Sequence, residues 1–216
     1  MILPFLLRHR IHLFAVSLLA VTLVIFLLII TIDPIVVLYV DQLSLPAYLL
    51  VGLETVSGIF DPVRITVIAT ACFLIFIAKN YFTGSNFLES KPAYFCASII
   101  LSFIITGSIK VIIGRYRPEL LFEHNMYGFD IFSFDQAHHS FPSGHAAITG
   151  TLWFSWHYFY QNRIVLAAIT VVLIAIVPGR IVLGDHFPSD IIFGLFVAYT
   201  AAYSMHILYR EKTEFN

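Results

Sequence analysis

Apolar residues along this chain gather into six runs, most of a length that suits a helix crossing a bilayer; the fourth is shorter. About 20 consecutive apolar residues are needed to cross the hydrocarbon core as a helix. The pattern therefore predicts an all-α, polytopic membrane protein with six transmembrane helices. The predicted spans cover about residues 11–32, 62–79, 92–113, 145–160, 164–184 and 190–209.

The segment between the first two runs has a different character. The stretch DPIVVLYVDQLSLPAYLLVGLETVSGIFDP, residues 33–62, combines prolines and acidic residues with an apolar stripe. Part of it could span, but a helix lying in the plane of the interface fits the pattern better. The connection at residues 117–144 is polar, aromatic and punctuated by proline and glycine, and it is predicted to be a loop.

Composition agrees with a membrane protein. Of 216 residues, 59% are hydrophobic and 12% charged, which is more apolar surface than a soluble domain of this size buries. The net charge of -1 offers no basic patch for nucleic acid. We expect one membrane-embedded domain over residues 1–216, with the first run retained as a helix because it exceeds a signal-peptide core. The oligomeric state stays open.

The distribution of Lys and Arg favours an orientation with both termini in the cytoplasm. Six spans with the N-terminus inside place seven of these residues on the inner side and five on the outer side. In this arrangement the ends of the third and fifth spans and the starts of the fourth and sixth meet at the outer face. Three polar clusters fall there.

The first cluster is KVIIGRYRPE, residues 110–119. Lys110 and Arg117 are seven residues apart, so on a helix they share a face about two turns apart. Pro118 places Arg117 at a helix end. Two cations on one face suit an anionic group, although snorkelling to lipid headgroups explains them equally well. Arg115 lies off that face and is expected to contact headgroups.

The second cluster is SFPSGHAAITG, residues 140–150. Ser143 is a natural N-cap, and Gly144 lets the backbone approach a ligand closely. Free N–H groups at a helix start form an anion site. His145 lies in the first turn, beside whatever binds there. The alternative is a capped helix with an interfacial histidine.

The third cluster is GRIVLGDHFPSD, residues 179–190. His186 and Asp190 are four apart and stack on one helical face. A carboxylate on one ring nitrogen fixes the tautomer and orients the other nitrogen as a nucleophile or base. Arg180 supplies another cation. Asp185, adjacent to His186, is expected to face elsewhere and be solvated. A purely structural His–Asp pair is the alternative.

Taken together, the clusters resemble the motifs KxxxxxxRP, PSGH and SRxxxxxHxxxD of the type 2 phosphatidic acid phosphatase superfamily. They stand here as KVIIGRYRP from Lys110, PSGH from Pro142 and RIVLGDHFPSD from Arg180, in the same order and with the same internal spacings. Ionisable groups at membrane depth are functional by default. Gly179 departs from the pattern, because the family usually has serine there. The change removes a hydroxyl that could hydrogen-bond phosphate, and it bears on rate or substrate rather than on class.

The resemblance implies a six-helix membrane core and metal-independent hydrolysis of a phosphoester or pyrophosphate through a phosphohistidine. In that scheme His186, held by Asp190, attacks phosphorus. His145 protonates the leaving oxygen and then activates water. The phosphate-binding residues would be Lys110, Arg117, Ser143, Gly144 and Arg180.

No cofactor or metal is expected. His138 and His139 precede the PSGH motif, and a metal site shared with His145 is conceivable. However, no carboxylate or cysteine completes a metal-binding pattern there.

The substrate implied by the resemblance is a lipid carrying phosphate or pyrophosphate, reached laterally from the bilayer. Small size and short loops resemble bacterial members acting at the periplasmic face of the inner membrane. Their substrates include lipid A, undecaprenyl pyrophosphate, phosphatidylglycerol phosphate and phosphatidate, of which the first two are favoured here. A phosphotransferase using the same site and, from another class, a membrane transporter are the alternatives.

Overall fold

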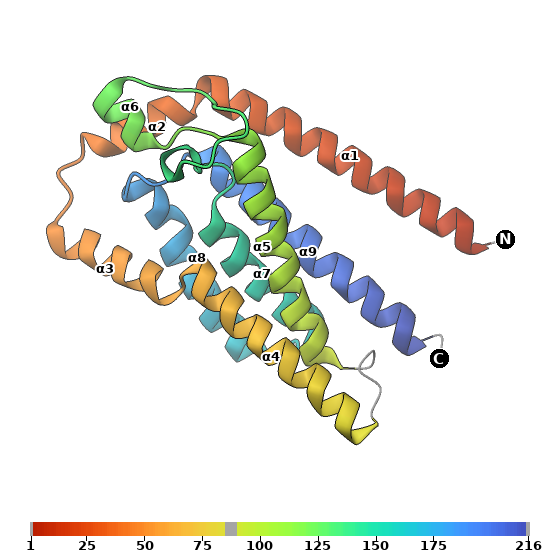
Figure 1. The fold of residues 1–216 in the computed structure, drawn as a ribbon. Helices are drawn as coiled ribbons and strands as arrows, with labels where there is room; N and C mark the ends of the chain where they lie inside the picture. The colour runs from red at the N-terminus through yellow and green to blue at the C-terminus, as the bar shows by residue number, and fades with distance from the viewer. Residues whose placement is uncertain (1, 85–89, 215–216) are drawn as a thin grey trace.

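The computed structural model describes residues 2–84 and 90–214, and in these residues helices are the regular structure throughout. Figure 1 shows long helices running roughly side by side, with short helices and loops at one end of the bundle. The all-α fold class is therefore confirmed for the described residues. In chain order the helices are α1 (Ile2–Thr31), α2 (Asp33–Asp41), α3 (Ala47–Ile59), α4 (Pro62–Thr83), α5 (Lys91–Ile113), α6 (Pro118–His124), α7 (Gly144–Phe159), α8 (Arg163–Val182) and α9 (Pro188–Glu214), with a 3₁₀ turn at Gln136–His138.

Each predicted apolar run coincides with a helix, but length and composition support fewer than six spans. Among the described residues, four stretches are long and apolar enough to cross a membrane: Ala47–Thr83, Lys91–Ile113, Arg163–Val182 and Pro188–Thr213. A fifth exists if Val16–Thr31 and Asp33–Asp41, which meet at 49°, form one span. Helix α7 has only 16 residues. Six spans therefore stays a prediction.

The segment predicted as one interfacial helix forms two helices, α2 and α3. They are separated at Leu43–Pro46 because Pro46 lacks a backbone N–H and cannot continue a helix from the preceding turn. Helix α2 contacts α8 and α9, and α3 contacts α8 before leading into α4. The segment is thus built into the bundle rather than lying apart from it.

Local signals set several helix starts. Asp61 accepts a hydrogen bond from the Arg64 N–H at the start of α4, 2.9 Å away. Asn162 caps α8 in the same way through the N–H of Ile164, at 3.0 Å. Such caps satisfy N–H groups that the first turn leaves without an intrahelical partner. They fix where α4 and α8 begin.

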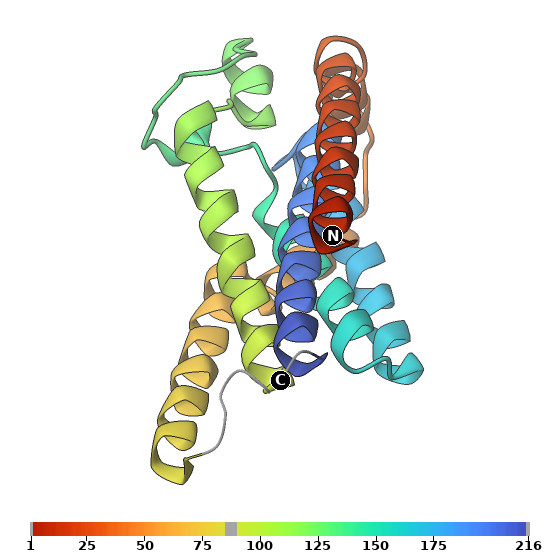
Figure 2. The same cartoon turned by 90° about the vertical axis from the view of Figure 1, so that its right-hand side faces the viewer.

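Helix α7 is the centre of the bundle. It packs against α4, α5, α8 and most extensively α9 (Figures 1 and 2). Small residues line this contact on both helices, including Ala146 and Ala147 of α7 and Ala198 of α9, all fully buried. Small side chains let two helix backbones approach closely, which is how membrane helices gain packing energy without a hydrophobic driving force.

Gly150 tests this close packing of α7 on α9. A Cβ at Gly150 would lie 2.9 Å from the Ala198 Cβ and 3.0 Å from a Leu195 methyl, whereas a Cβ at Gly107 of α5 would meet nothing within 4 Å. We expect Gly150→Ala to lower the free energy of unfolding by about 1–3 kcal/mol through overpacking. Gly107→Ala, the matched control, should leave it unchanged or raised. Thermal unfolding in detergent measures both, and equal midpoints would contradict the packing argument.

Candidate active site

The three polar clusters meet at one end of the bundle. The C-terminal ends of α5 and α8 and the N-terminal ends of α7 and α9 come together there, in the upper part of Figure 1. Ser143 at the start of α7 donates its N–H to the Asp190 carbonyl of α9, at 3.0 Å. Lys110 lies within electrostatic range of Arg117, Arg180 and Asp190. The structure thus brings the eight residues predicted from the motifs to one place.

A loop folds back over the end of α5 and holds its cations. The chain leaves α5 through Gly114 at φ +56°, where a Cβ would lie 1.7 Å from the Asp130 carbonyl oxygen, so only glycine fits. The Lys110 ammonium then donates to the His139 carbonyl. The backbone N–H of Arg117 donates to the Ala137 carbonyl at 2.9 Å. The predicted loop at residues 117–144 contains α6 and a 3₁₀ turn and positions both cations.

The start of α7 agrees with the predicted cap. Ser143 precedes the helix, and its hydroxyl accepts from the Ala146 N–H at 3.4 Å. Gly144 faces the start of α4, where a Cβ would lie 3.4 Å from the Pro62 Cγ. His145, in the first turn, directs Nε2 to the Ser57 carbonyl of α3, 3.2 Å away. The α3–α4 segment therefore forms one wall of the site, which sequence reasoning did not foresee.

His186 and Asp190 lie together as predicted. The His186 Nδ1 is 3.6 Å from the Asp190 Oδ2, an ion-pair distance slightly longer than a hydrogen bond, and both side chains are buried. With Nδ1 facing the carboxylate, Nε2 is the nitrogen left for chemistry. Burial lowers the pKa of His186 to about 3, against the opposing effect of Asp190. The ring is therefore neutral near pH 7, which leaves one ring nitrogen with a free lone pair.

Arg180 and Arg117 share a partner that was expected to be solvated. Asp185 places Oδ2 2.8 Å from the Arg180 Nη2 and Oδ1 3.5 Å from the Arg117 Nη1. The expectation was wrong because it assumed helical geometry. Here the chain turns at Gly184, with φ +72°, and neighbouring side chains no longer diverge as they do on a helix.

Arg115 is the second correction. Instead of contacting headgroups, its side chain is 1% exposed and forms ion pairs with Asp33 at 2.8 Å and Asp190 at 2.5 Å. It also donates to the Ser189 hydroxyl at 2.6 Å and to the Tyr127 Oη at 2.9 Å. Burial opposes the charge, but Asp190 and Asp33 together raise the pKa of Arg115. Because the helix ends at Gly114, Arg115 turns inward.

Asp33 enters the site from the junction of α1 and α2. Its carboxylate accepts the Ser189 N–H at 3.0 Å and also bonds the Ser189 hydroxyl. Sequence reasoning missed it, although an acidic residue at the end of an apolar run was a signal. Asp190 is equally well held, because its Oδ2 accepts from the Ser140 hydroxyl at 2.6 Å and the Phe187 N–H at 2.8 Å.

The loop histidines are engaged within the loop. His138 Nδ1 lies 3.0 Å from Asp130 and 2.8 Å from the Ser133 hydroxyl, and the His139 ring bonds the Ser133 carbonyl at 2.9 Å. Within the described residues, no group of three or more His, Cys, Asp or Glu side chains is arranged to hold a metal ion.

Comparison with known proteins agrees with these motifs. Residues 91–214, more than half of the chain, match the PAP2 superfamily. The protein therefore belongs to this family, the type 2 phosphatidic acid phosphatases. Asp33 and the α3–α4 wall lie outside the matched residues.

Two relatives carry the name lipid A 1-phosphatase. They come from Rhizobium etli and Rhizobium johnstonii, and each is 30% identical to this chain over 103 residues. The alignment covers 48% of this chain, 44% of the first relative and 41% of the second, so the chain spans less than half the length of the curated relatives it matches. No solved structure matches the chain.

Removing the buried guanidinium tests its role. Arg115→Met leaves Asp33 and Asp190 as buried carboxylates without a cation, and breaking such a pair costs about 3–5 kcal/mol. We expect a large fall in the thermal unfolding midpoint in detergent. Arg64→Met is the control, because Arg64 is exposed and its side chain donates to the nearby Gly58 carbonyl at 3.1 Å. Equal stability of the two variants would contradict the assignment.

Proposed function

We propose that this protein is an integral membrane lipid phosphatase that removes a phosphate or pyrophosphate group from a lipid through a phosphohistidine. One observation carries the proposal: Lys110, Arg117 and Arg180 gather around a buried His186 whose Nδ1 faces Asp190. Membership of the PAP2 superfamily supports the reaction class. We regard residues 1–216 as one functional domain.

In the first step the His186 Nε2 forms a bond to phosphorus as the bond to the leaving oxygen breaks. His145, protonated in the substrate complex, donates its proton to that oxygen and becomes neutral. The Nδ1 proton stays on His186 facing Asp190, whose carboxylate is fixed by Arg115, Ser140 and the backbone of residue 187. A nucleophile oriented in this way needs no movement of its own side chain before attack.

In the second step His145 takes a proton from water as the water oxygen attacks phosphorus. The N–P bond breaks, and inorganic phosphate leaves. Lys110, Arg117 and Arg180 neutralise the equatorial oxygens in both steps, with the Ser143 hydroxyl and the Gly144 N–H completing the cradle. These cations take the electrostatic role that metal ions serve in other phosphoryl transfer enzymes, so we propose a metal-independent reaction.

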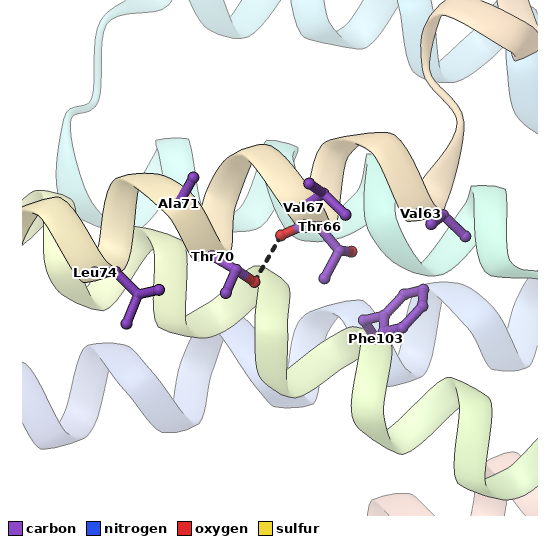
Figure 3. Close-up of a pocket in the computed structure, with 7 residues that line it drawn as sticks. All are labelled: Val63, Thr66, Val67, Thr70, Ala71, Leu74 and Phe103. Carbon is purple, nitrogen blue, oxygen red and sulfur yellow. Dashed lines mark hydrogen bonds between the residues drawn. The ribbon is translucent and has the colours of Figure 1, made fainter.

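A groove on the lipid-facing side offers a place for the substrate's hydrocarbon chain. It lies between α4 and α5 and has a volume of about 340 Å³ (Figure 3). Its first lining residue, Val63, follows Pro62, whose Cγ would lie 3.4 Å from a Cβ at Gly144. Thr70 donates its hydroxyl to the Thr66 carbonyl at 2.8 Å, so its polarity is satisfied within the helix. The lining residues are Val63, Thr66, Val67, Thr70, Ala71, Leu74 and Phe103.

We propose lipid A or undecaprenyl pyrophosphate as substrate, and the names of the two relatives favour a lipid A phosphate. The proposed location is a bacterial inner membrane with both termini in the cytoplasm and the site facing the periplasm. The Lys and Arg distribution supports this orientation.

Substitution of the two histidines tests the mechanism. We expect His186→Ala and His145→Ala each to reduce phosphate release to background, because one removes the nucleophile and the other the proton donor. A general acid contributes about 10²–10⁴-fold. His124→Ala, a 60% exposed surface histidine, is the control and should be fully active.

The measurement is release of free phosphate by purified protein from lipid A, undecaprenyl pyrophosphate, phosphatidylglycerol phosphate and phosphatidate. Free phosphate also separates hydrolysis from transfer to a lipid acceptor. Near-normal release by either histidine variant would show that the mechanism is wrong.

Chelation tests the metal-independent reaction. Because protein cations supply the charge stabilisation, we expect activity to be unchanged after incubation with EDTA and removal of the chelate. A complete loss that a single added metal restores would refute the proposal.

A further inference from the structure

A carboxylate occupies the position where phosphoryl oxygens are expected to bind. Asp185 lies between Arg180 and Arg117, with its two oxygens 2.8 Å and 3.5 Å from their nearest guanidinium nitrogens. In the pattern SRxxxxxHxxxD this position is unspecified, so the carboxylate is a feature of this chain rather than of the motif. An anion on two phosphate-binding arginines must either help them or compete with their ligand.

We propose that Asp185 competes with the phosphoryl group for Arg117 and Arg180, and that its return to the arginines promotes release of inorganic phosphate. This inference rests on the proposed phosphatase function. In the resting site the carboxylate keeps both arginines paired. Binding of a phosphoryl group displaces it, and it re-forms the pairs as phosphate leaves.

The two contacts differ in strength, which makes displacement easy on one side. The Arg180 contact has ion-pair geometry with a good hydrogen-bond distance, whereas the Arg117 contact is longer. Arg117 is held independently, because its Nε donates to the Gln136 carbonyl at 3.0 Å. An entering phosphoryl group can therefore bind the free side of Arg117 without disordering its side chain.

Asp185 has room to move away from the arginines. It lines a cavity of about 380 Å³ between α2, α6 and the turn that joins α8 to α9. Its side chain is 29% exposed, and burial raises its pKa although Arg180 and Arg117 act in the opposite direction. The carboxylate is thus neither deeply buried nor fully stabilised where it stands.

The cavity also supplies a force that drives the carboxylate back. Asp41 and Glu119 line the same cavity, so a displaced Asp185 approaches two other negative charges. Like charges at short range repel, and the repulsion is stronger where protein excludes water. The repulsion from Asp41 and Glu119 therefore makes the displacement of Asp185 reversible. A bound phosphate competes with Asp185 for the two arginines until it dissociates.

The net charge of the proposed phosphate site also favours competition between Asp185 and phosphate. Lys110, Arg117 and Arg180 carry three positive charges when protonated, and the pairs with Asp185 reduce the sum to two in the resting site. Without Asp185 the site would carry an excess of positive charge and hold inorganic phosphate more tightly.

The experiment compares Asp185→Asn with wild type for inhibition by inorganic phosphate and for KM and kcat with a lipid phosphate. We expect the inhibition constant and KM to fall together by about fivefold, the scale of one partly exposed ion pair, while kcat does not rise. An inhibition constant that is unchanged would overturn the proposal. One that increases would show that Asp185 positions the arginines for phosphate instead.

A second variant covers the case in which Asp185→Asn fails to fold. Glu119 is exposed, and Glu119→Gln removes part of the repulsion that returns Asp185 to the arginines, so the phosphate inhibition constant should fall by about twofold. Glu123→Gln is the matched control: it removes the same charge from α6 at a side chain that lies outside the cavity and pairs with His124. We expect the phosphate inhibition constant of Glu123→Gln to equal that of the wild type. Equal effects of the two glutamate variants would overturn the proposal.

Calorimetric titration of inorganic phosphate into His186→Ala protein separates this inference from the proposed function, because it needs no turnover. Tighter binding when Asp185→Asn is added to His186→Ala supports competition. Binding that is equal with and without Asp185 overturns the inference and leaves the phosphatase proposal intact. If neither protein binds phosphate, the proposed function itself is wrong.

Discussion

The buried ion pairs of Arg115 with Asp33 and Asp190 are the interaction on which the site depends. Removing three charged groups from water is costly, and the cost is met only when every polar atom finds a partner. Here the guanidinium contacts two carboxylates, a hydroxyl and a phenol, and both carboxylates accept further hydrogen bonds. Such a set of contacts tolerates one arrangement, so it fixes the junction of α1 and α2 against the first turn of α9.

These ion pairs influence the orientation of His186 through Asp190. One oxygen of Asp190 is bound by Arg115, and the other by the Ser140 hydroxyl and a backbone N–H, so the carboxylate cannot rotate toward solvent. His186 Nδ1 faces this fixed anion. The N-terminal segment therefore contributes to the orientation of the proposed nucleophile although it lies outside the residues that match the family. Arg115 and Asp33 are positioning residues in this sense.

Sequence alone predicted the bounds of the six long helices to within five residues, except at the start of α1, because long apolar runs mark them. It also placed Ser143 correctly as a cap. It did not predict the separate helices α2 and α3 or the short helix α6. It failed at Arg115 and Asp185 for one shared reason. Each follows a glycine with positive φ, Gly114 and Gly184, where helical facing rules no longer apply. It missed Asp33 because Ser189, which donates a hydrogen bond to Asp33, is 156 residues away in the sequence. A single sequence that is not aligned with others carries no signal for such a distant contact.

The site thus has two layers of opposite charge, and the proposed chemistry needs both. The inner layer of Asp33, Arg115 and Asp190 sums to one negative charge and lies on the Nδ1 side of His186. The outer layer of Lys110, Arg117 and Arg180 carries three positive charges when Lys110 is protonated, and Asp185 reduces the sum to two in the resting site. As Nε2 bonds to phosphorus, the imidazole ring becomes cationic while phosphoryl oxygens keep their negative charge. The inner layer stabilises the ring, and the outer layer stabilises the oxygens. If either layer were neutral, one half of this charge separation would develop in a low-dielectric site without a counter-charge.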